Sequence, residues 1–302
     1  MKLFVTIDTE PDCDISWRRS SPLAFSSVTE GIPGLLRPLW DRYGTRPVYF
    51  VSPEVVRDDG CCRVLASEIR NGAVIGAHLH SEYIEPEATI HDPAGRVSGE
   101  FPCYAHSTEI EFEKIRNLTL LIQERLGYQP VWYRAARYGA DIDTIRSLSR
   151  LGYRYDSSLT PGIDWSAIGG PDHSRAPLQP YWVSDDDLYT PAPEGAGTGI
   201  MEYPVTIRGK RLGPLGRFLP NNWLFYNWLR PTHMSVLEQK KIMKNIQREY
   251  SEPVFVLMFH SMEIMINKTP FVRNRIMQKR FLKNLEAIIR YVAASDTHDV
   301  VQ

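Results

Sequence analysis

Short runs of β-branched and aromatic residues alternate with longer segments of helical period along most of the chain. Such alternation is typical of βα units that build a mainly parallel sheet. The sequence therefore predicts an α/β protein, and its 302 residues fit one large domain or two ordinary ones. Seven strands are expected, at residues 2–7, 47–51, 73–79, 130–134, 153–156, 200–206 and 253–260.

Helices are expected between these strands, with glycine and capping signals at their ends. Gly44, Gly72 and Gly127 are each placed to end a helix, because glycine accepts the left-handed conformation common at helix C-termini. Thr108 and Ser235 each precede a glutamate by three residues, which is the spacing of a capping box. The expected helices cover residues 32–43, 62–71, 109–126, 142–151 and 272–292, with one more beginning near Ser235.

Two stretches interrupt this alternation with little periodicity. Residues 160–198 are rich in proline, glycine, acidic and aromatic residues. Residues 208–232 hold a group of aromatic side chains, namely Trp223, Phe225, Tyr226 and Trp228. These rings would either stack on a sugar chain or fill the core. Because long irregular segments in a compact domain are usually functional, we expect one domain over residues 1–302 with rim or lid insertions within 160–232.

Composition excludes several classes of partner. The formal net charge is -1, from 35 basic and 36 acidic residues, so no nucleic acid partner is expected. The longest apolar runs are too short to span a membrane, and Met1 leads directly into a strand-like segment rather than a signal peptide. We therefore expect a cytoplasmic protein. The four cysteines lack C-x-x-C spacing and are expected to be reduced.

Reactive side chains follow five of the seven expected strands at their C-terminal ends. In a closed parallel barrel these ends meet at one mouth, where the catalytic groups of such enzymes lie. The positions therefore predict a shared site. The residues concerned are Asp8, Glu10, His78, His80, Arg134, Arg137, Asp156, His260 and Ser261.

Two pairs with two-residue spacing indicate a metal centre. Asp8 and Glu10 would lie on one side of a strand end, where one carboxylate can bind a metal while the other accepts a proton from water. His78 and His80 share this spacing, although such a pair alone also suits structural histidines. With Glu10 they form a two-histidine, one-carboxylate set that leaves positions open for water and substrate, as in a catalytic zinc site.

His260 ends the most hydrophobic strand of the protein, and a rigid strand end is a suitable place for a general acid. Asp156 is placed to accept a hydrogen bond from His260 and keep its imidazole cationic. Either Arg134 or Arg137 could pair with Asp8 and lower the pKa of that carboxyl, and the sequence does not separate the two arginines.

These motifs, in this order, resemble those of the polysaccharide deacetylases, the NodB-homology family of metal-dependent carbohydrate de-N-acetylases. The first motif resembles a variant branch in which one residue separates the base from the metal ligand. The second departs from the usual pattern of two histidines four residues apart, because Glu82 stands four residues after His78 and His80 lies between them. The first, third, fourth and fifth motifs correspond to residues 6–10 (TIDTE), 134–139 (RAARYG), 155–158 (YDSS) and 259–261 (FHS).

The resemblance implies a distorted (β/α)7 barrel and hydrolysis of the N-acetyl amide of an amino sugar. It also implies one divalent ion, by default zinc, although cobalt or nickel would suit the same ligands. We predict that His80 rather than Glu82 completes the metal set, with Asp12 as a substitute ligand. The implied roles are base for Asp8, ligands for Glu10, His78 and His80, acid for His260, orientation of Asp8 for Arg134, and partner of the acid for Asp156.

Two other functions fit the same residues. The altered second motif would also suit a catalytically silent, carbohydrate-binding relative. A related amidohydrolase that acts on a small cyclic amide is the other, because loop changes let one barrel host several chemistries. An O-acetyl ester is a further substrate class, since the same metal and base would cleave it.

Overall fold

The structure is a computed structural model, and it describes residues 1–88, 100–209, 226–232 and 234–295. Its central sheet contains seven parallel strands in the order β11-β1-β2-β3-β4-β5-β8. All seven lie where the sequence predicts strands, with bounds that differ by a few residues. They are β1 (Lys2–Thr9), β2 (Val48–Val51), β3 (Val74–Leu79), β4 (Trp132–Ala135), β5 (Tyr155–Asp156), β8 (Met201–Glu202) and β11 (Val254–His260).

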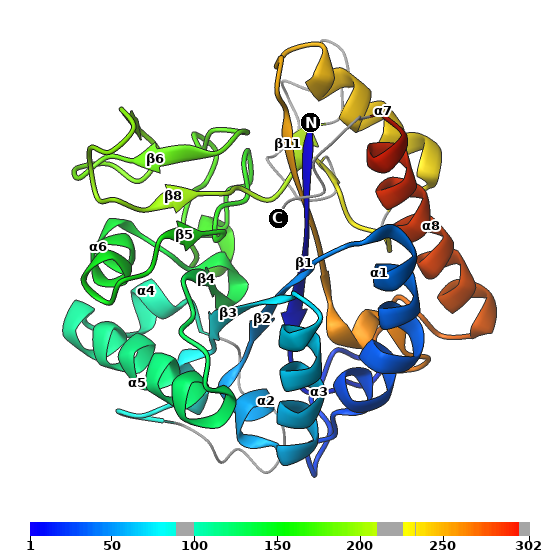
Figure 1. Ribbon diagram of the computed structural model, residues 1–302. Coiled ribbons are helices and arrows are strands. Elements are labelled where there is room, and N and C mark those ends of the chain that lie inside the picture. The colour runs from blue at the N-terminus through cyan, green and yellow to red at the C-terminus, as the bar shows by residue number, and fades with distance from the viewer. Residues whose placement is uncertain (89–99, 210–225, 233, 296–302) are drawn as a thin grey trace.

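The sheet curls into the expected distorted barrel (Figure 1). After β8 the chain turns toward β11, where Thr206 N donates to Val256 O at 3.0 Å. Val256 N donates in return to Thr206 Oγ1 at 2.8 Å. Since β5 and β8 have only two residues each, this half of the barrel depends on such isolated bonds more than the half formed by β1 to β4.

Strand register brings predicted site residues side by side. Asp8 on β1 is the partner of His260 on β11, and His78 on β3 is the partner of Arg134 on β4. Because parallel strands end at the same edge, these four side chains are presented at one mouth of the barrel.

Helices cover the outside of the sheet (Figure 1). The helices expected from the sequence are present, and Gly44 and Gly127 take the left-handed conformation at helix ends, with φ of 63° and 61°. The described helices of five or more residues are η1 (Ser27–Leu36), α1 (Arg37–Tyr43), α2 (Pro53–Arg57), α3 (Asp59–Arg70), α5 (Thr108–Leu126), α6 (Ile142–Arg150), α7 (Val236–Gln247) and α8 (Arg275–Ser295).

One predicted helix start is confirmed, and two others differ from the prediction. The capping box of Ser235 is confirmed at the start of α7. At α5, Ser107 rather than Thr108 is the cap, because the extended backbone of Ser107 lets its hydroxyl accept from Ile110 N. The first helical segment begins at Ser27, five residues before the expected start, because Asp12 accepts hydrogen bonds from Ser26 N and Ser27 N.

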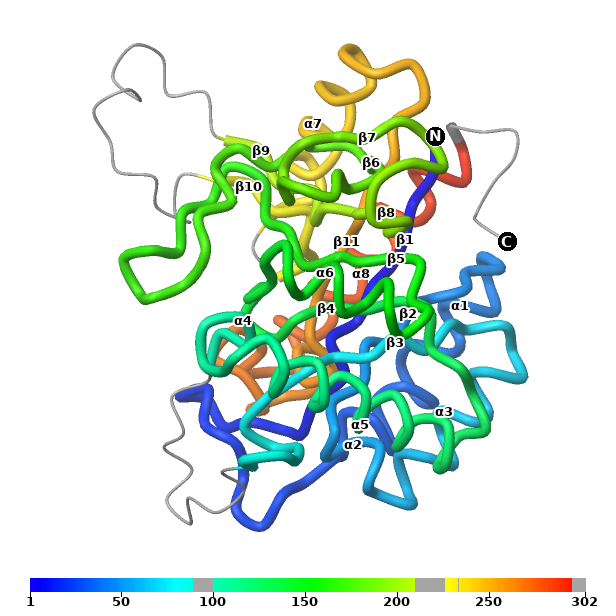
Figure 2. The backbone as a smooth tube through the Cα atoms, turned by 90° about the vertical axis from the view of Figure 1, so that its left-hand side faces the viewer, coloured from blue at the N-terminus to red at the C-terminus, as the bar shows by residue number. Residues whose placement is uncertain are grey.

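The stretch expected to be irregular contains short strands. β6 (Tyr181–Val183) and β7 (Pro191–Ala192) extend the sheet beyond β8 in antiparallel pairing, in the half of the molecule that contains the N-terminus (Figure 2). β9 (Ile207–Gly209) and β10 (Tyr226–Trp228) form a separate pair. Strands of two or three residues leave no periodic signal in a sequence. Trp223 and Phe225 lie outside the described residues.

The hydrophobic core lies between the sheet and its helices, with Ile7, Phe255 and Leu285 among the buried residues. All four cysteines lie in the described part of the chain and are free. In the described residues, every helix is too short or too polar to cross a membrane.

Candidate active site

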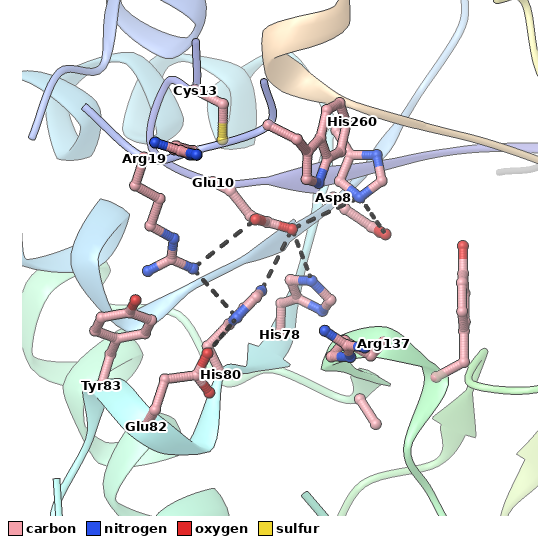
Figure 3. Close-up of a pocket in the computed structure, with 14 residues that line it drawn as sticks. Asp8, Glu10, Cys13, Arg19, His78, His80, Glu82, Tyr83, Arg137 and His260 are labelled. Atoms are coloured by element: carbon pink, nitrogen blue, oxygen red, sulfur yellow. Dashed lines mark hydrogen bonds and ion pairs between the residues drawn. The ribbon is translucent and has the colours of Figure 1, made fainter. Parts of the chain in front are cut away.

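The C-terminal ends of β1, β3, β4 and β11 surround a pocket of about 330 Å³. Figure 3 shows the predicted site residues Asp8, Glu10, His78, His80 and His260 pointing toward one another in this pocket. The residues that line it are Asp8, Glu10, Cys13, Trp17, Arg18, Arg19, His78, His80, Glu82, Tyr83, Ala135, Arg137, Tyr138 and His260.

The spacing of Glu10, His78 and His80 matches that of metal ligands. Glu10 Oε1 lies 3.3 Å from His78 Nε2 and 3.3 Å from His80 Nε2. In a tetrahedral site with bonds of about 2.0–2.1 Å, neighbouring ligand atoms are about 3.3 Å apart. All three residues are buried, and their ligand atoms lie within 4.8 Å of one another.

Hydrogen bonds behind the two histidines direct their Nε2 atoms inward. His78 Nδ1 lies 2.9 Å from the carbonyl oxygen of Arg134, and a proton on Nδ1 leaves Nε2 free to bind a metal. His80 Nδ1 lies 3.4 Å from Glu82 Oε1. His80 Nε2 is buried without a hydrogen-bond partner among the described residues, as expected of a ligand atom that awaits an ion. These residues fit a divalent cation.

Glu82 and Asp12 are placed differently from ligands. Glu82 stands behind His80, so the arrangement favours His80 over Glu82 in the metal set. Both carboxylate oxygens of Asp12 accept hydrogen bonds from Ser26 and Ser27, and Asp12 lies outside the metal cluster. The predicted substitute role of Asp12 is therefore wrong, because its carboxylate caps the first helical segment instead.

Arg134 pairs with Asp8, which settles the choice that the sequence left open. Arg134 Nη1 donates to Asp8 Oδ1 at 2.6 Å, and both side chains are buried. Burial raises the pKa of Asp8, but Arg134, His78 and His260 outweigh this effect, so the pKa lies below its usual value. Asp8 is thus a carboxylate at neutral pH.

Arg137 follows a different path from Arg134 at the end of β4. It is exposed, with φ of 54°, and its guanidinium lies 4.7 Å from the centre of the Phe101 ring. The left-handed backbone turns this side chain toward the pocket mouth, away from the inward position of Arg134.

His260 faces the same carboxylates. Its Nε2 atom lies 3.9 Å from Asp8 Oδ2 and 3.8 Å from Glu10 Oε1. On the other side of the ring, Nδ1 lies 3.0 Å from Glu263 Oε1. The Nδ1–H group can therefore donate a hydrogen bond to Glu263 while Nε2 points into the pocket.

Glu263, rather than the predicted Asp156, is the partner of His260. Unlike the residues predicted from strand ends, Glu263 lies in the short helix η7 (Ser261–Ile264) that directly follows β11. Its carboxylate also contacts Arg230 and accepts from Thr232 Oγ1 at 2.6 Å. Burial raises the pKa of Glu263, but the opposing effects of Arg230 and His260 are stronger. The pKa of this carboxyl therefore lies well below its usual range. The spacing His260-x-x-Glu263 was the sequence signal that could have identified it.

Asp156 belongs to a second polar cluster inside the barrel. It accepts a hydrogen bond from Ser158 Oγ at 2.6 Å, and it is the register partner of Glu202 on β8. The prediction that it pairs with His260 is wrong because four strands lie between β5 and β11 on one side, and β8 lies between them on the other.

Arg19 is a site residue that the sequence did not indicate. It forms an ion pair with Glu54 and lies 3.9 Å above the centre of the Tyr83 ring. Its Nη2 atom is 3.9 Å from Glu10 Oε2 and 3.2 Å from His80 Nδ1. Arg19 comes from the loop after β1, where no periodicity or strand end marks it.

The described residues of 160–232 line no part of the pocket, whose rim is built largely by residues 13–19. Arg230 and Thr232 instead support His260 from behind, through Glu263. Trp228 is buried beside Tyr138, at 5.8 Å between ring centres, so it fills the core. The role of 160–232 as a rim or lid stays a prediction.

Comparison with known proteins identifies the fold. No protein-family model matches the sequence. A candidate polysaccharide deacetylase from Mycobacterium smegmatis superposes with a TM-score of 0.52 at 17% identity, over 98% of this chain and 84% of that one. The chain has the polysaccharide deacetylase fold. The resemblance stated from the motifs is thus matched by an independent resemblance in three dimensions.

Two further relatives show what the polysaccharide deacetylase fold does and does not fix. A peptidoglycan deacetylase-like protein of Gibberella zeae is 25% identical over 150 residues, which are 48% of this chain and 44% of that protein. The match thus spans less than half of that relative's length. A 4-alpha-glucanotransferase from Thermococcus litoralis has a TM-score of 0.53 at 13% identity, over 97% of this chain and 38% of that one. Because a transferase shares the barrel, the reaction must be argued from the site.

Proposed function

We propose that the chain is a metal-dependent hydrolase that removes an N-acetyl group from an amino sugar. The observation that carries this proposal is the meeting of three kinds of group in one pocket. They are a cluster with metal-ligand spacing, an ionised carboxylate and a histidine whose outer nitrogen is held by an acid. Amide hydrolysis needs these three functions, namely an electrophile, a base and an acid.

Glu10, His78 and His80 would hold the divalent ion, which we propose to be zinc because two of the three donors are imidazole nitrogens. When bound, such an ion polarises a carbonyl oxygen and lowers the pKa of water. Arg19 restrains Glu10 and His80 from outside, since its guanidinium lies within 4 Å of both side chains.

Asp8 would act as the general base. Its Oδ1 atom is engaged by Arg134, whereas Oδ2 faces the pocket and His260. Arg134 is itself fixed by bonds to Ser157 O and Thr6 Oγ1, so the carboxylate has one orientation. As water oxygen attacks the amide carbon, Asp8 takes one of its protons.

His260 would act as the general acid. Glu263 holds Nδ1, so Nε2 faces the pocket beside Asp8 and Glu10, where a proton on it would reach the leaving nitrogen (Figure 3). His260 donates this proton to the departing nitrogen, and the products are acetate and a free amino sugar. The proton taken by Asp8 balances the one given by His260.

The test is release of acetate from fully acetylated chitooligosaccharides by the purified, zinc-supplied protein. The account predicts release that stops with a chelator and in His78→Ala, and that persists in Arg116→Gln, a surface variant. Binding of the sugar without acetate release would favour the catalytically silent reading. Release only from a cyclic amide would favour the amidohydrolase reading.

We also propose that residues 1–302 act as one catalytic barrel. The continuous sheet order from β11 to β8 supports this proposal, since site residues come from strands at both ends of the chain. The cytoplasmic location expected from the sequence stays a prediction, and cell fractionation with an antibody to the protein tests it.

A further inference from the structure

Two of the three arginine side chains that line the pocket have no carboxylate partner among the described residues. Arg18, Arg19 and Arg137 all line the pocket. Arg19 is paired with Glu54 and approaches Glu10. Arg18 and Arg137 are exposed, and among the described residues neither side chain has a carboxylate within 4.0 Å, although the backbone of Arg18 contacts Asp14. Two cations at the mouth are therefore free to bind a ligand.

Backbone conformation holds these side chains at the mouth. Five described non-glycine residues have positive φ, and Trp17, Arg137 and Tyr138 among them line the pocket, with φ of 64°, 54° and 63°. Residues with a Cβ adopt this conformation at an energetic cost, and such strain gathers where the placement of a side chain serves function. Strain in both Trp17 and Arg137 thus marks two separate segments that shape one mouth.

The charge balance of the pocket favours an anion. Its lining contains the carboxylates of Asp8, Glu10 and Glu82 against an equal number of arginines. Asp8 is also neutralised from behind by Arg134. A divalent ion on Glu10 and the histidines would add two positive charges, which leaves the loaded pocket cationic.

Building on the proposed function, we propose that the substrate is an acylated amino sugar with an anionic group, phosphate or carboxylate, close to the acylated amine. Arg137 binds this group, while Arg18, which is also exposed at the mouth, adds to the positive charge of the pocket. Figure 3 shows Arg137 on the other side of the metal cluster from Arg19, so the anion would lie beside the reacting amide and clear of the Arg19–Glu54 pair.

Trp17 provides the surface for the sugar ring. Its side chain is 40% exposed and lies edge-on to His260, at 5.2 Å between ring centres. It is also braced by Phe271 at 5.3 Å. An exposed indole beside the acid suits stacking on an apolar sugar face, while the guanidinium of Arg137 selects charge.

The test compares affinities of the zinc-supplied protein for three probes by titration calorimetry. The probes are N-acetylglucosamine, which is neutral, N-acetylglucosamine 1-phosphate, and N-acetylmuramic acid, which has a carboxylate. We expect at least one charged probe to bind about tenfold or more tightly than the neutral one. The tighter of the two charged probes identifies the kind of anion.

Variants then assign this preference to the arginines. Arg137→Gln is expected to reduce the charged-to-neutral affinity ratio about tenfold, Arg137→Lys to retain part of it, and Arg18→Gln to have a smaller effect. Neutral-probe affinity should change little in each. Arg116→Gln, a surface change on α5, is the matched control and should keep the full ratio.

Equal affinity for charged and neutral probes, or no binding of any probe, would overturn the inference. So would a preference that survives in Arg137→Gln and Arg18→Gln together. Acetate release from the same probes separates the two proposals. Release without charge preference supports the hydrolase and overturns the anion site, whereas charge preference without release supports the anion site and contradicts the hydrolase.

Discussion

Two buried acidic clusters lie inside the same barrel and differ in their neighbours. In the first, Asp8 on β1 pairs with Arg134 on β4 and faces the pocket. In the second, Asp156 on β5 stands beside Glu202 on β8, with Ser158 and Leu159 N as hydrogen-bond donors. The carboxylates of both clusters lie at or next to the C-terminal ends of strands and are inaccessible to bulk solvent, or nearly so.

The neighbouring charge decides what each carboxylate can do. Arg134 outweighs the effect of burial on Asp8 and keeps the pKa of that carboxyl below its usual value. In the second cluster burial raises the pKa of both acids, and the charge of Asp156 raises that of Glu202 further. One cluster therefore presents a base to the pocket, while the other retains a proton and joins two strands. A position at a strand end does not by itself make a catalytic residue.

Replacement of the base should have the largest effect. Asp8→Asn is expected to lower kcat/KM for an acetylated amino sugar by about 10³-fold, because the base is lost while the shape is kept. Asp156→Asn is the matched change in the second cluster and should alter kcat/KM by only a few fold. Equal losses in the two variants, measured on folded protein, would break the comparison.

The partner of the acid should come next. Glu263→Gln is expected to lower kcat by about 10²-fold, since a neutral amide beside His260 Nδ1 removes the negative charge that supports proton donation from Nε2. Glu249→Gln, which changes a surface carboxylate paired with Arg208, is the control. If Glu263→Gln kept activity within a few fold of the parent, Glu263 would not be the partner that His260 needs for catalysis.

The second cluster should appear in stability rather than activity. Because the pKa of Glu202 is raised on folding, the folded chain holds a proton that the unfolded chain releases above about pH 4.5, so stability falls as pH rises. Glu202→Gln removes this loss. We expect the variant to lose about 2–4 °C less in Tm than the parent between pH 5 and pH 9. If Tm changed equally with pH in the parent and the variant, the proton shared by Asp156 and Glu202 would be contradicted.

The smallest expected effect concerns the strained mouth. Arg137→Gly should have a free energy of unfolding about 1 kcal/mol higher than that of Arg137→Ala, because both lose the contact with Phe101 but only glycine relaxes at φ of 54°. Chemical denaturation measures the difference. Alanine equal to or more stable than glycine would show that this position is not strained.

Much of the fold was predictable because its signals are local. Each parallel strand is an apolar run between turn residues, and Asp8, Glu10, His78, His80 and His260 each lie at a strand end or within one residue of it. Once the strands are ordered in a barrel, these five residues must meet at one mouth.

The remainder depended on contacts between distant segments. The left-handed turn after β4 directs Arg137 to the pocket mouth while Arg134 points inward, and no signal in the sequence predicts this turn. Asp156 was misassigned because its separation from β11 depends on strand order across the whole sheet. Arg19 reaches the metal cluster from a loop held by Glu54. Glu263 is different, because it lies only three residues after His260, and this local spacing is visible in the sequence.

The central claim is that the pocket is a catalytic metal centre, and metal content tests it most directly. Elemental analysis of the zinc-supplied protein should give about one zinc per chain, and His78→Ala, His80→Ala and Glu10→Gln should each lose most of it while Arg116→Gln retains it. A parent protein that holds no metal after zinc is supplied, or that holds it equally in the ligand variants, would contradict the account.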